Sequence, residues 1–122
     1  MLSKSLLILF LIPLFDLPWL LYQNSSNQEM FYKIQGKRPI EFRIIYAIPV
    51  YIALAYLLTK QTNVTDAFLT GAATYAVYDF TCMAVLKDYY IETAVLDVLW
   101  GGILFAAVFV VANRAKEVFK LS

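Results

Sequence analysis

Four long apolar runs divide the chain, and shorter polar stretches separate them. The runs cover about residues 5–22, 43–59, 67–86 and 93–112. Each approaches the roughly 17 to 25 residues that an α-helix needs to cross the ~30 Å hydrocarbon core of a bilayer. Charged residues fall almost entirely outside these runs, rather than along one face of each helix as in a soluble bundle. The pattern predicts an all-α, single-domain integral membrane four-helix bundle with four transmembrane helices, covering residues 1–122.

The first two runs carry features that could argue against spanning helices. The first follows Lys4 and so resembles a signal peptide, but it lacks a small-x-small cleavage signal. Pro13, Asp16 and Pro18 also interrupt its apolar region, so we interpret it as a retained span. The second run is short and contains Pro49, which a membrane helix tolerates better than a soluble helix does.

The longest connection is the polar segment at residues 23–42, which contains several apolar residues among Gln, Lys and Glu. These apolar residues are Met30, Phe31 and Ile34. Two interpretations are open, namely a short helix lying in the membrane interface and an ordinary loop with a few anchoring aromatic side chains. The other two connections, at residues 60–66 and 87–92, are predicted to be tight turns.

Four spans place both termini on the same side of the membrane. Basic residues, which usually mark the cytoplasmic face, divide five to five between the two sides, so the sequence sets no orientation. The terminal side carries Lys4, Lys60, Arg114, Lys116 and Lys120, and the opposite side carries Lys33, Lys37, Arg38, Arg43 and Lys87.

Composition agrees with a protein whose main partner is the lipid bilayer. Of the 122 residues, 61% are hydrophobic and 16% are charged, and the net charge of +1 leaves no basic surface for nucleic acid. The chain has no histidine, which excludes imidazole zinc sites, Ser-His triads and histidine general bases. The single Cys82 has no basic neighbour in its span, so we interpret it as a small packing residue.

Three aspartates interrupt the apolar runs at what we predict to be one level of the bilayer. Because successive spans alternate in direction, Asp16, Asp79 and Asp97 lie about six, seven and four residues from the side opposite the termini, or ~6 to 10 Å deep. Asp16 and Asp97 each precede a tryptophan by three residues, so that Trp19 and Trp100 share their helical faces.

Small residues indicate that these acids face the interior of the bundle. Ala72 and Ala76 share a stripe with Asp79, and the glycines at 101–102 follow Asp97, which would allow close helix contact. A charged side chain is costly in hydrocarbon, which also favours an inward position. The candidate ligand or ion site comprises Asp16, Asp79, Asp97, Trp19, Trp100, Tyr75, Tyr78 and Thr81, with Tyr46 and Tyr51 as possible hydroxyl donors.

Two interpretations of the aspartates are open. In the first, each is a neutral acid that joins helices through hydrogen bonds to indole, hydroxyl or backbone groups, and the tryptophans are packing and interface anchors. In the second, the three acids line a site for a ligand, a proton or a cation. The sequence identifies neither a metal nor a cofactor.

Several of these motifs together resemble a known family. They are Asp16-x-x-Trp19, "FLTGAATYAVYDFTC" at residues 68–82, "DVLWG" at 97–101 and "MFYKIQG" at 30–36. The combination resembles an uncharacterised family of small, mostly bacterial, predicted membrane proteins, named domain of unknown function 2177. The family pattern has Asn after Tyr-Asp-x-Thr where this chain has Cys82, which removes an amide beside Asp79. The resemblance implies a four-helix membrane protein and supplies no established activity.

Three classes of function are therefore open. The first is a small carrier, channel or binding protein that uses the three acids for protons, cations or an amine-bearing solute. The second is a non-catalytic structural or accessory subunit, with other membrane subunits or a second copy of the chain as partners. The third is a lipid-modifying membrane enzyme whose paired carboxylates act as acid and base or hold a hard divalent metal. The enzyme is least favoured, because no recognised catalytic motif is present.

Overall fold

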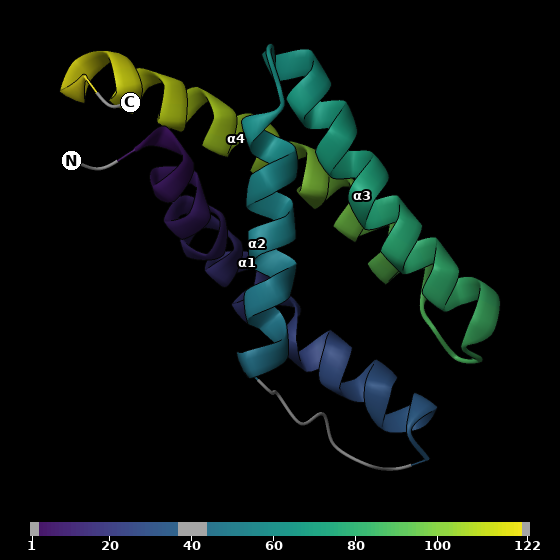
Figure 1. Cartoon of the computed structure of the whole chain (residues 1–122). Helices are drawn as coiled ribbons and strands as arrows, with labels where there is room; N and C mark the ends of the chain where they lie inside the picture. The colour runs from purple at the N-terminus through teal and green to yellow at the C-terminus, as the bar shows by residue number, and fades with distance from the viewer. Residues whose placement is uncertain (1–2, 37–43, 121–122) are drawn as a thin grey trace.

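The protein is built from α-helices connected by short segments (Figure 1). The structure, a computed structural model, describes residues 3–36 and 44–120, and these contain four helices and no strand. The helices are α1 (Lys4–Ile34), α2 (Ile44–Thr59), α3 (Val64–Val85) and α4 (Ile91–Phe119). The prediction of an all-α protein is confirmed.

Two of the described helices, α1 and α4, are long and apolar enough to cross a membrane. The 16 residues of α2 form a shorter apolar helix. The 22 residues of α3 are enough to span, but polar side chains, including two aspartates, lower its mean hydropathy. The structure therefore supports a membrane protein, and four spans stay a prediction.

The first helix is longer than its apolar run. Helix α1 continues through the polar segment to Ile34, so the loop interpretation is wrong for residues 23–34. Pro13 and Pro18 lie inside the helix, where each removes a backbone donor. Figure 1 shows the helix changing direction between its purple first part and its blue second part. Residues 37–42 of the predicted connection and Arg43, the predicted start of the second span, lie outside the described residues.

Successive helices run in alternate directions, so the beginning of α1 and the end of α4 lie at the same end of the molecule (Figure 1). Consistent with this, the Lys4 ammonium lies 5.8 Å from the ring centroid of Phe109. Helix α4 packs against both α1 and α3, whereas α2 packs mainly against α1. The central helix of the fold is therefore α4.

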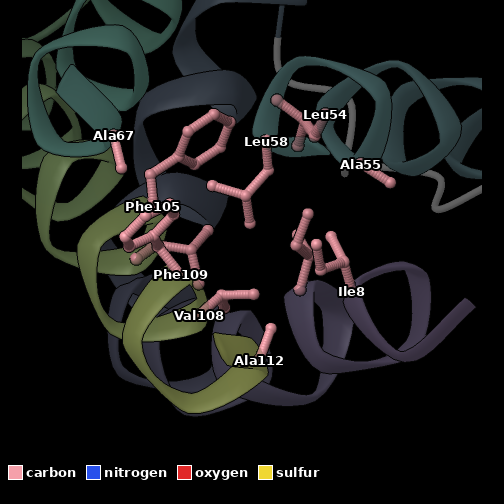
Figure 2. Packing of buried hydrophobic residues seen from close by; sticks show 11 residues of the cluster. Ile8, Leu54, Ala55, Leu58, Ala67, Phe105, Val108, Phe109 and Ala112 are labelled. Carbon is pink, nitrogen blue, oxygen red and sulfur yellow. The ribbon is translucent and has the colours of Figure 1, made fainter. Parts of the chain in front are cut away.

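The apolar core lies where α1, α2 and α4 meet. Figure 2 shows side chains from these three helices pointing toward one another, among them Ile8, Leu58 and Val108. Each of these three is almost fully buried. Within a bilayer, such contacts stabilise the bundle through close packing rather than through removal from water.

The closest approach of two helices joins α3 to α4 through glycine. A Cβ atom added at Gly71 would overlap the carbonyl oxygen of Gly101, and one added at Gly101 would lie 2.5 Å from the Tyr75 ring. The contact therefore requires the absence of side chains at both positions. It lies beside the predicted stripe, since Ala72 and Ala76 are only half-buried.

Replacing Gly71 with Ala should destabilise the protein by roughly 1 to 3 kcal/mol, because the added methyl group meets backbone that cannot easily move. Thermal unfolding in detergent measures the change. Ala73→Leu is the matched control, since Ala73 lies on the exposed side of the same helix and should tolerate the larger residue. Equal melting temperatures for Gly71→Ala and the unmodified protein would contradict this account of the contact.

Candidate functional site

The two Asp-x-x-Trp motifs bind each other across the interface of α1 and α4. The indole nitrogen of Trp100 donates to Asp16 Oδ1 at 2.8 Å, and that of Trp19 donates to Asp97 Oδ1 at 3.1 Å. The two indoles stack with their ring centroids 5.2 Å apart and their planes 8° from parallel. Because the helices are antiparallel, each aspartate lies opposite the tryptophan of the other motif. We call these four residues the Asp–Trp clasp.

Hydroxyl groups extend the clasp to the remaining helices. Tyr51 of α2 donates to Asp16 Oδ2 at 2.8 Å, so both oxygens of Asp16 accept a hydrogen bond. Tyr89, in the turn before α4, donates to Asp79 Oδ1 at 2.5 Å. The side chains of Asp79 and Asp97 lie within hydrogen-bonding reach of each other. The three carboxyl groups thus belong to one polar cluster that connects all four helices.

Asp79 is the least satisfied of the three acids. It is fully buried, with an exposed fraction of 0%, and its Oδ2 atom has no donor among the described residues. The carboxyl of Asp97 also lies within hydrogen-bonding reach of the Asp79 side chain. Two carboxylates this close cannot both stay ionised unless a proton or another positive group lies between them. The arrangement favours positive charge at this point.

The cluster borders a cavity of about 460 Å³ that residues from all four helices line. Its described lining includes the three acids and several aromatic side chains but no Lys or Arg. The ion pair of the described chain, Lys33–Glu29 at 3.5 Å, is exposed and lies outside this lining. The acids of the cavity therefore have no basic partner within the part of the chain that the structure describes.

Most of the predicted site residues meet here. Six of the eight line the cavity: Asp16, Trp19, Tyr75, Tyr78, Asp79 and Asp97. Trp100 joins them through its bond to Asp16, and Tyr51 supplies the hydroxyl that was expected of it. Thr81 and Tyr46 are exposed and do not line the cavity. Thr81 follows Asp79 by two residues, which is about 200° around a helix, so it points to the other side.

The cavity residues that were not predicted from the sequence include Asn27, Phe31 and Tyr89. Asn27 and Phe31 are four residues apart and share one face of α1, a spacing that is informative only once the segment is known to be helical. Tyr89 lies in the turn that precedes α4, outside the four apolar runs. Burial, followed by the hydrogen bond to Asp79, raises the pKa of its hydroxyl, which therefore stays protonated and donates.

The second half of α1 closes this end of the cavity against the α3–α4 turn. The backbone N–H of Tyr90 donates to the Met30 sulfur at 3.2 Å, and the Lys33 ammonium donates to the Tyr90 hydroxyl at 2.9 Å. The Phe31 and Tyr89 rings meet edge to face with centroids 6.0 Å apart. These contacts join the second half of α1 to the turn that carries Tyr89.

The cavity offers carboxyl, hydroxyl and amide groups but not a metal-binding set. Among the described residues, no group of three His, Cys, Asp or Glu side chains is arranged to hold a metal ion. Carboxyl groups in such surroundings can bind positive charge and exchange protons.

Trp100→Phe should destabilise the protein by about 1 to 3 kcal/mol, because an aromatic ring stays at this position while Asp16 loses the indole N–H donor. Thermal unfolding in detergent tests this expectation. Tyr46→Phe is the control, because the Tyr46 side chain is 67% exposed and lies outside the cavity. If the two substitutions lower the melting temperature equally, the indole bond makes no special contribution.

Comparison with known proteins agrees with the family resemblance seen in the motifs. A family model described as a predicted membrane protein, DUF2177, matches residues 4–113. This segment contains the Asp–Trp clasp and every residue that lines the cavity. No curated protein and no solved structure matches the chain. The chain therefore belongs to the DUF2177 family of predicted membrane proteins.

Proposed function

We propose that this protein crosses the membrane with all four helices and binds a small cation or proton between them, as a carrier or binding protein. The main support for the proposal is that three carboxyl groups line one cavity whose described lining contains no basic side chain. A carboxylate in apolar surroundings is stable only when protonated or paired with positive charge. A cation entering this cavity would meet that requirement.

The aromatic lining and the volume of the cavity also suit an organic cation. Aromatic rings attract positive charge through the negative face of their π-systems. Six such side chains line the cavity: Trp19, Phe31, Tyr51, Tyr75, Tyr78 and Tyr89. Its volume of about 460 Å³ falls within the range of roughly 300 to 1,000 Å³ that is typical of small-molecule sites.

A purely structural role accounts for one acid better than for another. Asp16 has donors on both oxygens and joins three helices, as expected of a hydrogen-bonding anchor. Asp79 has a donor on one oxygen, none among the described residues on the other, and the Asp97 carboxyl within hydrogen-bonding reach. A purely structural pair would have to share a proton, whereas an ionised pair needs a positive group beside it. Asp79 is therefore the acid on which the proposed function depends.

The four-span arrangement has a direct test. Reporters fused at residues 1 and 122 and one inserted at Thr62 should report one compartment, while reporters between residues 37 and 43 and at Asp88 should report the other. The Thr62 position decides the number of spans. If α1 and α4 alone crossed the membrane, Thr62 would lie in the same compartment as Asp88, and the proposed topology would be wrong.

Asp79→Asn should keep the fold and weaken cation binding, because the amide has nearly the same shape but carries no charge. With phenethylammonium as the probe and the full chain in detergent, calorimetry should show a loss of affinity of about tenfold or more. Asp79→Leu should in addition destabilise the protein by about 1 to 3 kcal/mol, because the Tyr89 hydroxyl loses its acceptor.

Asp88→Asn is the matched control for charge, since Asp88 is exposed at φ 71°, a conformation that Asn accepts readily. Its affinity for phenethylammonium should equal that of the unmodified protein. If the Asp79→Asn variant binds the probe with unchanged affinity, the proposed ion site is wrong and Asp79 has only the structural role.

A further inference from the structure

Two buried acceptor atoms point to the chemistry of the ligand. Within the described part of the chain, Asn27 Oδ1 and Asp79 Oδ2 are buried without a hydrogen-bond donor, and both residues line the cavity. Buried polar atoms of folded proteins are nearly always paired, and an unpaired one costs free energy. Two such atoms, both on residues that line one cavity, indicate that this part of the protein lacks donors for its buried acceptors.

Contacts between neighbouring residues link the two acceptor residues. Asn27 is one helical turn from Phe31 on α1, and the Phe31 ring meets Tyr89, whose hydroxyl binds Asp79. A chain of direct neighbours therefore connects the amide of α1 to the carboxyl of α3. In this chain of contacts, the Phe31–Tyr89 pair lies between the two acceptor residues.

We propose that the cavity binds a cation that carries at least two N–H donors, such as a primary ammonium or a guanidinium group. One N–H donates to Asp79 Oδ2 and another to Asn27 Oδ1, while Asp79 and Asp97 supply the negative charge. The inference rests on the proposed function and names the ligand class of the same site.

The acceptor pair distinguishes this class from other cations. A quaternary ammonium group has no N–H, so it would gain the attraction of the aromatic walls but leave both acceptors unpaired. The remainder of an amine-bearing ligand would lie against apolar lining residues such as Leu20, Val50 and Leu54. The structure thus favours an organic primary amine with an apolar body.

The test compares phenethylammonium with its N,N,N-trimethyl counterpart by calorimetry on the full chain in detergent. The two share charge and aromatic body, and the second lacks N–H donors. Phenethylammonium should bind about tenfold or more tightly than the trimethyl compound. This comparison needs no variant, so it does not depend on whether a substituted protein folds.

A substitution of Asn27 tests whether its side chain accepts one of the N–H groups of the ligand. Asn27→Ala should weaken phenethylammonium binding by about tenfold and leave the affinity for the trimethyl compound unchanged. Asn24→Ala is the matched control, because Asn24 is exposed on the same part of α1 and does not line the cavity.

The outcomes separate this inference from the proposed function. Equal or tighter binding of the trimethyl compound would overturn the N–H requirement and leave a cation site with aromatic walls. Equal loss of both affinities in Asn27→Ala would also overturn it, since the amide would then shape the cavity without accepting an N–H. Binding of neither compound would contradict the proposed function itself.

Discussion

A carboxyl group in an apolar helix must find hydrogen-bond donors inside the bundle, and the rest of this structure depends on how that need is met. The described Lys and Arg residues lie near helix ends, so the donors are neutral indole and phenol groups. Asp16 alone ties α1 to α2 and α4. Neutral donors hold the acids in place without cancelling their charge, as a basic side chain would do.

The glycine contact between α3 and α4 also determines where the carboxyl groups lie. Without side chains at Gly71 and Gly101, the two backbones come close enough for side chains further along each helix to meet. Asp79 lies two turns beyond Gly71, and Asp97 lies one turn before Gly101, so antiparallel packing brings these two carboxyls together. The proximity of two like acids is therefore a product of backbone packing between α3 and α4.

Hydrophobic pattern alone was sufficient to predict helices and to single out the three acids, because a lone Asp in a long apolar run has few explanations. The hydrophobic pattern could not show that Trp19 donates a hydrogen bond to Asp97, since the two residues lie on different helices and their pairing depends on the antiparallel register. The sequence left the helical state of residues 23–34 open, because their polar side chains show no clear periodicity, and Asn27 was missed for the same reason. Thr81 was chosen for its nearness in sequence to Asp79, although the helical repeat directs it elsewhere.

The Asp–Trp clasp has a consequence for how the bundle can move. Its two hydrogen bonds run in opposite senses between the same pair of helices, with stacked rings between them. Sliding α1 along α4 by one helical turn, roughly 5.4 Å, would break both bonds and separate the rings at once. Lengthwise displacement of these helices is thus opposed in either direction. Helix α2 lies outside this pair of opposed bonds and is held to α1 by the Tyr51–Asp16 hydrogen bond and by apolar packing.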